Sequence, residues 1–110
     1  MKVIVGIGID SESRLRIEAA CAREPVFRQK LQDQSGNFDV SNFTIFEAFF
    51  KAIGCPTSLD WNEVMIFRES GRPSIKLKGK LARIWSNTEI HVSITHAQDI
   101  VTAIVMIERP

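Results

Sequence analysis

The sequence predicts an α+β domain in which an antiparallel or mixed sheet packs on a long apolar helix. Three features support this fold class: β-branched runs at both ends of the chain, a helical segment over residues 43–54 that is apolar on nearly all sides, and the turn signal of a hairpin near residue 71. The expected order of elements is β-α-α-β-β-α-β-β, which is typical of α+β domains.

The chain has 110 residues, of which 45% are hydrophobic, and we expect one domain spanning residues 1–110. The formal net charge is +1, so attraction of a charged partner must come from local patches, and nothing indicates nucleic-acid binding. Cys21 and Cys55 fit neither a disulfide framework nor a zinc site, and we expect reduced thiols. The N-terminal apolar run is too short for a signal peptide or a membrane span, which favours a cytoplasmic protein without membrane contact.

The apolar run over residues 2–9 predicts the first strand, and a helical pattern begins with the polar residues that follow it. Gly6 and Gly8 suit the close approach of another backbone or of a ligand, because neither has a Cβ. Asp10 is therefore expected at a strand-to-helix junction. There it either binds a ligand or serves as the N-cap of the helix, a role that Ser11 could also fill.

The first helix is expected to place its apolar side chains on one face and its arginines largely on the other. The arginines are Arg14, Arg16 and Arg23, and Pro25 marks the end of the helix. Residues 26–37 are predicted to form a loop or a frayed helical turn. The arginine face is either a patch that attracts an acidic partner or an ordinary solvated surface.

The second helix is expected to begin near Asp39 or Ser41 and to end with Gly54 at C′. Its apolar character indicates packing on several sides, and only Glu47 and Lys51 interrupt it. These two residues stand four apart, so the simplest interpretation is an exposed ion pair worth a few tenths of a kcal/mol. Among phenylalanines, however, such charges need a partner or a solvent cleft. A metal ion would be a partner for Glu47, and a phosphate would be a partner for Lys51.

The second half of the chain predicts two hairpins with a short helix between them. The first hairpin has strands over 61–67 and 74–78, and the helix is expected over 79–86. The second hairpin follows, with strands over 91–96 and 100–107. His96 ends its strand, where it is either a hydrogen-bonded structural residue or a ring presented to a cleft.

Four separated segments carry a more specific pattern. They are Gly6-Ile7-Gly8-Ile9-Asp10, Phe46-Glu47-Ala48-Phe49-Phe50-Lys51-Ala52-Ile53-Gly54, Gly71-Arg72-Pro73 and His91-Val92-Ser93-Ile94-Thr95-His96. In order and spacing they resemble the 4′-phosphopantetheinyl transferases, most closely the small holo-acyl-carrier-protein synthase type.

The resemblance implies the fold of that family and its reaction. The phosphopantetheine arm of coenzyme A would pass to a serine of an acyl carrier protein in fatty-acid or polyketide biosynthesis, leaving adenosine 3′,5′-bisphosphate. The resemblance also implies a Mg²⁺ requirement and a homotrimer with sites between subunits. Which carrier protein is modified does not follow from the sequence.

The resemblance also implies roles for single residues. The metal-binding acids of the family correspond to Asp10 and Glu47, where a hard ion would bridge the coenzyme A diphosphate to the protein. Lys51 is expected to contact a phosphate or to help remove the serine proton, and His96 to contact a coenzyme A phosphate. Glu12 recreates the Asp-x-Glu spacing of the larger transferase subfamily, so it is either a third metal ligand or an acid favoured at a helix N-terminus.

The first helix also matches the family. Arg16-Ile17 corresponds to an Arg-Ile pair that docks the acidic recognition helix of the carrier protein. Together with Arg14 and Arg23, Arg16 is expected to form a local docking patch.

The chain departs from the family pattern at several positions near the residues expected to act in the reaction. Asn42 and Phe46 stand where an arginine and a lysine are usual, Ser13 stands where an acid is common, and the loop over residues 54–58 is short. Charge-assisted contacts are worth about 1.5–3 kcal/mol each, so losing two would weaken coenzyme A binding or catalysis.

Two functions are therefore compatible with the sequence. One is an active, divergent transferase, and the other is a non-catalytic relative that binds carrier protein or coenzyme A or acts as a structural subunit. We favour the enzyme, because a drifting pseudo-enzyme would lose metal ligands as readily as phosphate contacts, and here the ligands remain.

Overall fold

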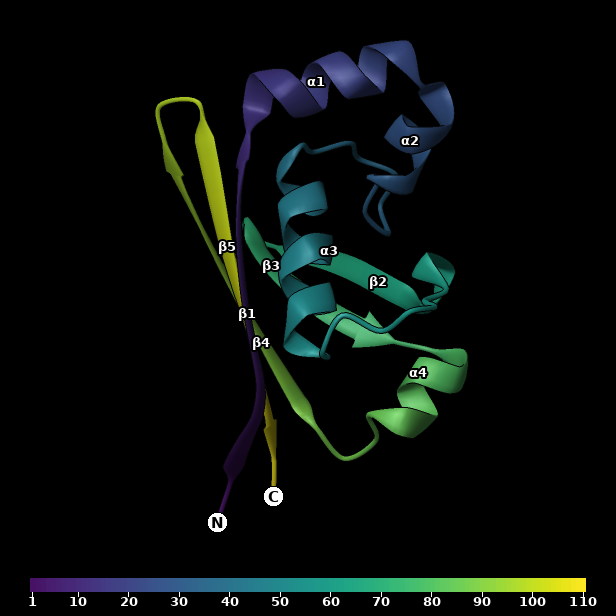
Figure 1. Cartoon of the computed structure of the whole chain (residues 1–110), viewed down its shortest axis with the longest axis vertical. Helices are drawn as coiled ribbons and strands as arrows, with labels where there is room; N and C mark the ends of the chain where they lie inside the picture. The colour runs from purple at the N-terminus through teal and green to yellow at the C-terminus, as the bar shows by residue number, and fades with distance from the viewer.

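A central helix lies between two antiparallel sheets (Figure 1). The structure is a computed structural model that describes residues 1–110. Its elements are β1 (Val3–Ser13), α1 (Arg14–Arg23), α2 (Pro25–Lys30), α3 (Ser41–Ala52), the 3₁₀ turn η1 (Trp61–Glu63), β2 (Val64–Glu69), β3 (Arg72–Leu77), α4 (Gly79–Ile84), β4 (Glu89–Ala97) and β5 (Ile100–Arg109). The predicted α+β class is confirmed.

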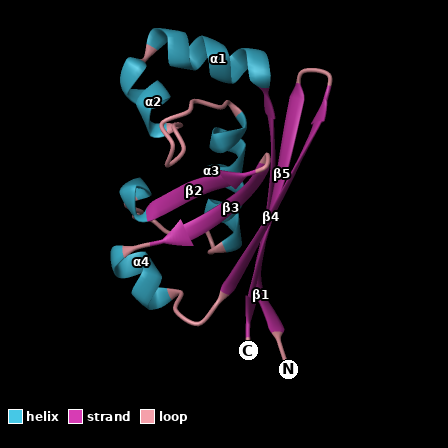
Figure 2. Cartoon of the chain, turned by 180° about the vertical axis from the view of Figure 1, so that it is seen from behind, coloured by secondary structure: helices cyan, strands magenta, loops and turns pink.

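The larger sheet has the strand order β1-β5-β4 and is antiparallel throughout. One face of it lies under α3, where alternate residues of β5 are fully buried: Val101, Ala103, Val105 and Ile107. No element of the chain covers the opposite face, as both views show (Figures 1 and 2). The sheet therefore has an inner face that builds the core and an outer face that is open.

Helix α3 is apolar all round because it is covered on two sides, which confirms the expectation from its sequence. Ile45 and Phe49 are fully buried and share one hydrophobic cluster with Val64 and Ile66 of β2. The helix ends as predicted with Gly54 in the left-handed region, at φ 91°. No helix of the chain combines the length and the apolar character that crossing a bilayer requires.

Two glycines of β1 let α3 approach the strand directly. A Cβ at Gly8 would overlap the carbonyl oxygen of Ala48 and the backbone nitrogen of Ala52, and a Cβ at Gly6 would overlap the Ala52 carbonyl oxygen. Of the two groups expected to approach these glycines closely, a backbone or a ligand, the structure shows a backbone, that of α3. It brings the C-terminal half of α3 against β1, and this contact positions the candidate site.

The first strand is longer than predicted, and Asp10 lies within it instead of at a junction with the helix. Asp10, Ser11 and Glu12 pair with Ala103, Thr102 and Val101 of β5, because the long β5 offers partners to polar residues that would otherwise leave the sheet. The predicted N-cap at Asp10 or Ser11 is wrong. Ser13 caps α1, and its Oγ accepts a hydrogen bond from the Arg16 backbone.

Two shorter segments are also clarified by the structure. Of the two alternatives for residues 26–37, a loop or a frayed helical turn, the first part is helical: α2 begins with Pro25 at a position where the missing N–H costs nothing. Residues 61–63 form a 3₁₀ turn instead of the start of a strand, because the Asp60 side chain accepts a hydrogen bond from the Asn62 backbone.

Candidate functional site

The candidate site begins with an ion pair between β1 and α3. Lys51 Nζ lies 2.9 Å from Asp10 Oδ1 and 3.0 Å from the carbonyl oxygen of Ile9, and it donates to both. The Asp10 side chain is 11% exposed and that of Lys51 is 45% exposed. The predicted i,i+4 ion pair with Glu47 does not form, because the close packing on Gly8 puts Asp10 within reach of the lysine.

Two further carboxylates surround this pair. The pKa of Glu47 is raised, first because partial burial penalises its charged form and second because Asp10 repels it. The same two causes, in the same order, raise the pKa of Glu12. The hydrogen bond to Asp10 is the main cause of a raised Lys51 pKa. The structure thus brings the three predicted metal-binding acids into one electrostatic environment, although Glu12 lies in the strand and not in the first turn of α1.

The donor set suits a hard divalent cation. Asp10 Oδ2 is buried and has no hydrogen-bond partner, which is unusual for a carboxylate oxygen. A cation such as Mg²⁺ is held by one or two carboxylates, with phosphate oxygens and water completing the shell. Asp10, Glu12 and Glu47 do not all present an oxygen within 4.8 Å of one another, so three-carboxylate coordination would require side-chain movement.

One group of three potential ligands does meet that distance, and it lies elsewhere. Glu89, His91 and Glu108 project from the outer face of the sheet. They are already paired, since His91 Nε2 lies 2.6 Å from Glu108 Oε1 and Lys2 Nζ lies 2.8 Å from Glu89 Oε1. Glu89 and Glu108 face each other directly across β4 and β5, where like charges are destabilising. Lys2 and His91 therefore give each of these glutamates a partner.

His96 does not join the Asp10–Lys51 pair. It lies on β4, at the opposite edge of the sheet from β1, and β5 separates the two strands. Two strand spacings and the offset in register put the Asp10 and His96 backbones roughly 12 Å apart. The exposed ring instead has its Nδ1 3.5 Å from Arg14 Nη1.

The turn between β4 and β5 fixes the start of α1. Asp99 Oδ1 accepts a hydrogen bond from the Leu15 backbone at 3.1 Å, and Asp99 Oδ2 accepts one from the Ser13 hydroxyl at 2.5 Å. The Asp99 carbonyl oxygen also accepts from the Arg14 backbone at 2.8 Å. Sequence reasoning missed Asp99, because no local pattern marks a cap that comes from a distant turn.

The predicted docking arginines divide into two groups. Arg16 and Arg23 line a groove together with Glu12, and this groove also contacts Phe27 and Phe43. Arg14 is half-buried and turns toward His96. The groove therefore connects two exposed arginines with one of the candidate metal-binding acids.

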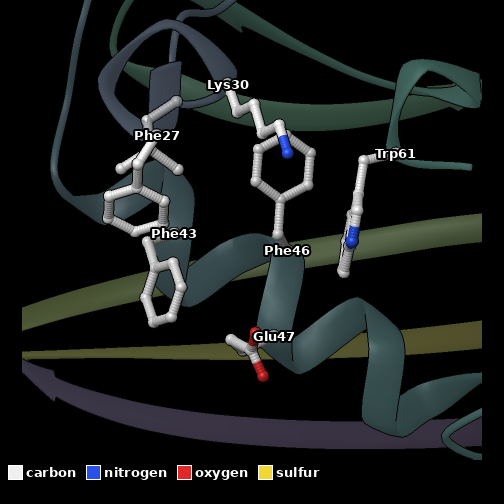
Figure 3. A pocket seen from close by; sticks show the side chains of 7 residues that line it. Phe27, Lys30, Phe43, Phe46, Glu47 and Trp61 are labelled. Atoms are coloured by element: carbon white, nitrogen blue, oxygen red, sulfur yellow. The ribbon is translucent and has the colours of Figure 1, made fainter. Parts of the chain in front are cut away.

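A second, more apolar pocket adjoins this groove and has a volume of about 240 Å³ (Figure 3). Its walls include Phe27 and Phe43, shared with the groove, and Trp61, which packs edge-on against Phe46. Lys30 and Glu47 also line it. In Figure 3 the Lys30 side chain points from α2 toward Phe46, and the Glu47 carboxylate points away from Phe46. Lys30 is a basic residue of this region that sequence reasoning did not identify.

Asn42 and Phe46, two of the departures from the family pattern, have structural roles. Asn42 is fully buried, where its amide donates to the Leu31 carbonyl oxygen at 2.6 Å and its Oδ1 accepts from Arg68 at 2.9 Å. Phe46 is buried against Trp61. Neither side chain provides a charge for a ligand, and both stabilise the packing of α3.

Comparisons with known proteins agree on one family. No protein-family model matches the chain. A holo-[acyl-carrier-protein] synthase from Shouchella clausii is 37% identical over 96% of this chain and 99% of the relative, and one from Beutenbergia cavernae is 32% identical over 97% and 100%. Among solved structures, a holo-ACP-synthase from Plasmodium yoelii has a TM-score of 0.81 at 23% identity, covering 100% and 98% of the two chains. A Helicobacter pylori holo-[acyl-carrier-protein] synthase in complex with coenzyme A has a TM-score of 0.77 at 24% identity, covering 92% and 98%.

Proposed function

The chain belongs to the holo-[acyl-carrier-protein] synthase family of phosphopantetheinyl transferases, and from this premise we propose that it transfers the phosphopantetheine arm of coenzyme A to a serine of an acyl carrier protein with the help of Mg²⁺. The observation that carries the proposal is the buried, unpartnered Asp10 oxygen beside Glu47 and Lys51. A binding module would have no need for a desolvated carboxylate with neighbouring acids at this position.

Asp10 and Glu47, with Glu12 beside them, would hold the metal. When bound, Mg²⁺ would neutralise the diphosphate of coenzyme A, so that attack by the serine oxygen on the phosphorus that carries pantetheine breaks the P–O–P bond and adenosine 3′,5′-bisphosphate leaves. Lys51, which its raised pKa keeps protonated, adds a mobile positive charge for a phosphate oxygen, and the proton of the attacking serine passes to water. Attack at phosphorus depends chiefly on alignment and charge neutralisation, and these residues supply both.

The carrier protein would dock on α1. Arg16 and Arg23 offer positive charge along the groove, and acidic partners are steered by such local patches even when the total charge is near zero. The apolar pocket between Phe27 and Phe43 continues the groove toward Glu47 and suits an apolar side chain of the docked helix. Arg14 faces His96 and would lie at the edge of the docking surface.

We further propose that the chain acts as a homotrimer with sites shared between subunits. The open face of the larger sheet carries Ile7, Ile9 and Ile104, which are 57%, 58% and 42% exposed in the single chain. A continuous apolar face of this kind marks a protein interface. His96 lies at the far edge of the sheet from Asp10, so in a shared site it would contact coenzyme A held by another subunit.

We expect Ile104→Lys to convert the trimer into monomers at micromolar concentration, because three unpaired ammonium groups would be buried at a cost of several kcal/mol each. Ile84→Lys is the matched control, since Ile84 is 56% exposed on α4 and lies away from this face. Light scattering coupled to size-exclusion chromatography measures the mass. An Ile104→Lys variant that keeps the mass of the unmodified protein would exclude this face as the trimer interface.

The chain is also proposed to act as one domain in the cytoplasm. A single hydrophobic cluster draws residues from Ile17 to Ile107, and both cysteines are free thiols, which suits a reducing compartment.

Mass spectrometry tests the proposed reaction. Apo-carrier protein incubated with the chain, coenzyme A and Mg²⁺ is expected to gain the mass of one phosphopantetheine group, and chelation by EDTA is expected to prevent the gain. If no apo-carrier protein from the fatty-acid, polyketide or peptide classes is modified while carrier or coenzyme A binding persists, the chain is a non-catalytic relative.

A further inference from the structure

Lys51 occupies one side of the carboxylate that the proposed metal site requires. Its ammonium contacts Asp10 Oδ1 at 2.9 Å and the Ile9 carbonyl oxygen at 3.0 Å, so two oxygens of β1 already surround a positive charge. The other oxygen of the carboxylate, Asp10 Oδ2, is buried and has no partner. The lysine thus compensates only part of the charge that Asp10 carries into the sheet.

A divalent cation and this ammonium cannot both remain close to Asp10 without strong repulsion, because two positive charges a few ångströms apart in a partly buried site are poorly screened. The lysine is the partner that can move. Its side chain is 45% exposed and has a flexible four-carbon stem, whereas the Asp10 side chain is 11% exposed and is fixed within β1.

We propose that Lys51 is an internal counter-ion that competes with the divalent cation for Asp10 and is released when the cation binds. This inference rests on the proposed function, because it assumes that Asp10 is a metal ligand. Release of the ammonium from Ile9 and Asp10 leaves it one helical turn from Glu47, where it could contact a diphosphate held by the metal. Metal binding and presentation of Lys51 to the substrate are thereby one coupled event.

The coupling has a cost that can be measured. Because the ammonium held at Asp10 Oδ1 repels a cation at Oδ2, the intact lysine lowers the affinity of the site for the cation. We expect Lys51→Met to bind Mn²⁺ about tenfold more tightly than the unmodified protein, within the range typical of coupled sites, even though it loses transferase activity.

Electron paramagnetic resonance of free Mn²⁺ gives this affinity without any catalytic assay. Lys30→Met is the matched control: it makes the same substitution at a lysine that lines the pocket beside Glu47 and makes no ion pair with Asp10. Its Mn²⁺ affinity is expected to stay within about twofold of the unmodified protein, because the Lys30 ammonium is exposed, is screened by salt and does not contact Asp10. A second readout is the NMR signal of the Lys51 ε-methylene, which should shift with Mg²⁺ at the same concentration that saturates the site.

The possible results separate the inference from the function on which it rests. If the unmodified protein binds Mn²⁺ and Lys51→Met binds it equally or more weakly, Lys51 does not compete and the inference fails while the metal site stands. An equal gain in Lys30→Met would show a general charge effect and would also overturn the inference. If neither the unmodified protein nor Lys51→Met binds Mn²⁺ better than Asp10→Asn, the proposed metal site itself is wrong.

Discussion

Asp10→Asn is expected to lower kcat/KM for carrier modification by about 10³-fold without unfolding the protein. Asparagine keeps the shape of the side chain but removes the negative charge. A metal-stabilised leaving group contributes several kcal/mol to the transition state, and each 1.36 kcal/mol corresponds to a factor of ten. The same substitution also frees Lys51 from its partner. Carrier modification followed by mass spectrometry, with Mg²⁺ in excess, gives the rate.

Glu69→Gln provides the control for this change. Glu69 is an exposed acid at the end of β2 that makes no ion pair, so removing its charge tests whether net charge alone affects the reaction. Its rate should match that of the unmodified protein. If Asp10→Asn retained activity within about fivefold, the loss would fall near 1 kcal/mol, too little for a metal ligand, and the assignment of Asp10 would be wrong.

Gly8→Ala is expected to have the largest effect on stability, lowering the free energy of unfolding by about 3 kcal/mol or more. Overpacking a close contact costs about 1–3 kcal/mol where side chains can adjust, and here the neighbouring atoms belong to the backbone of α3 at Ala48 and Ala52. The helix would have to move away from β1. Urea denaturation at one fixed protein concentration measures the change, because the proposed assembly would make apparent stability depend on concentration.

Gly36→Ala separates this steric cost from the cost of losing a glycine. Gly36 has a φ of 82° and no heavy atom within 4 Å of the added Cβ, so its replacement should cost only the penalty of the left-handed backbone, about 1–2 kcal/mol. If Gly8→Ala were no less stable than Gly36→Ala, the close approach of α3 to β1 would not be a structural requirement. Displacement of α3 should also weaken the contact between Lys51 and Asp10, which links this packing to the site.

Much of the fold follows from local patterns in the sequence. The apolar residues over 43–54 predicted a helix packed on several sides, and the structure places α3 between two sheets. The final hairpin and the left-handed Gly54 also follow from short-range signals. These features depend on residue types within a few positions of one another, so sequence reasoning could reach them.

The features that failed depend on contacts between distant residues. The length of β1 is set by its pairing with β5, which continues beyond Asp10 to Ser13. The N-terminus of α1 is held by Asp99, more than eighty positions away. For Lys51, the helical spacing favoured Glu47, but the glycines of β1 brought Asp10 closer. In each case tertiary packing selected a partner over the neighbour in sequence.

The convergence of Asp10 and Glu47 on one cation is tested most directly by crystals grown with Mn²⁺ and coenzyme A. Anomalous scattering locates the manganese ion independently of the protein density. We predict one peak with an oxygen of each carboxylate within about 2.5 Å and a diphosphate oxygen in the same shell. Manganese bound at Glu89, His91 and Glu108 instead, or bound at the diphosphate with neither Asp10 nor Glu47 as a ligand, would contradict the proposed mechanism.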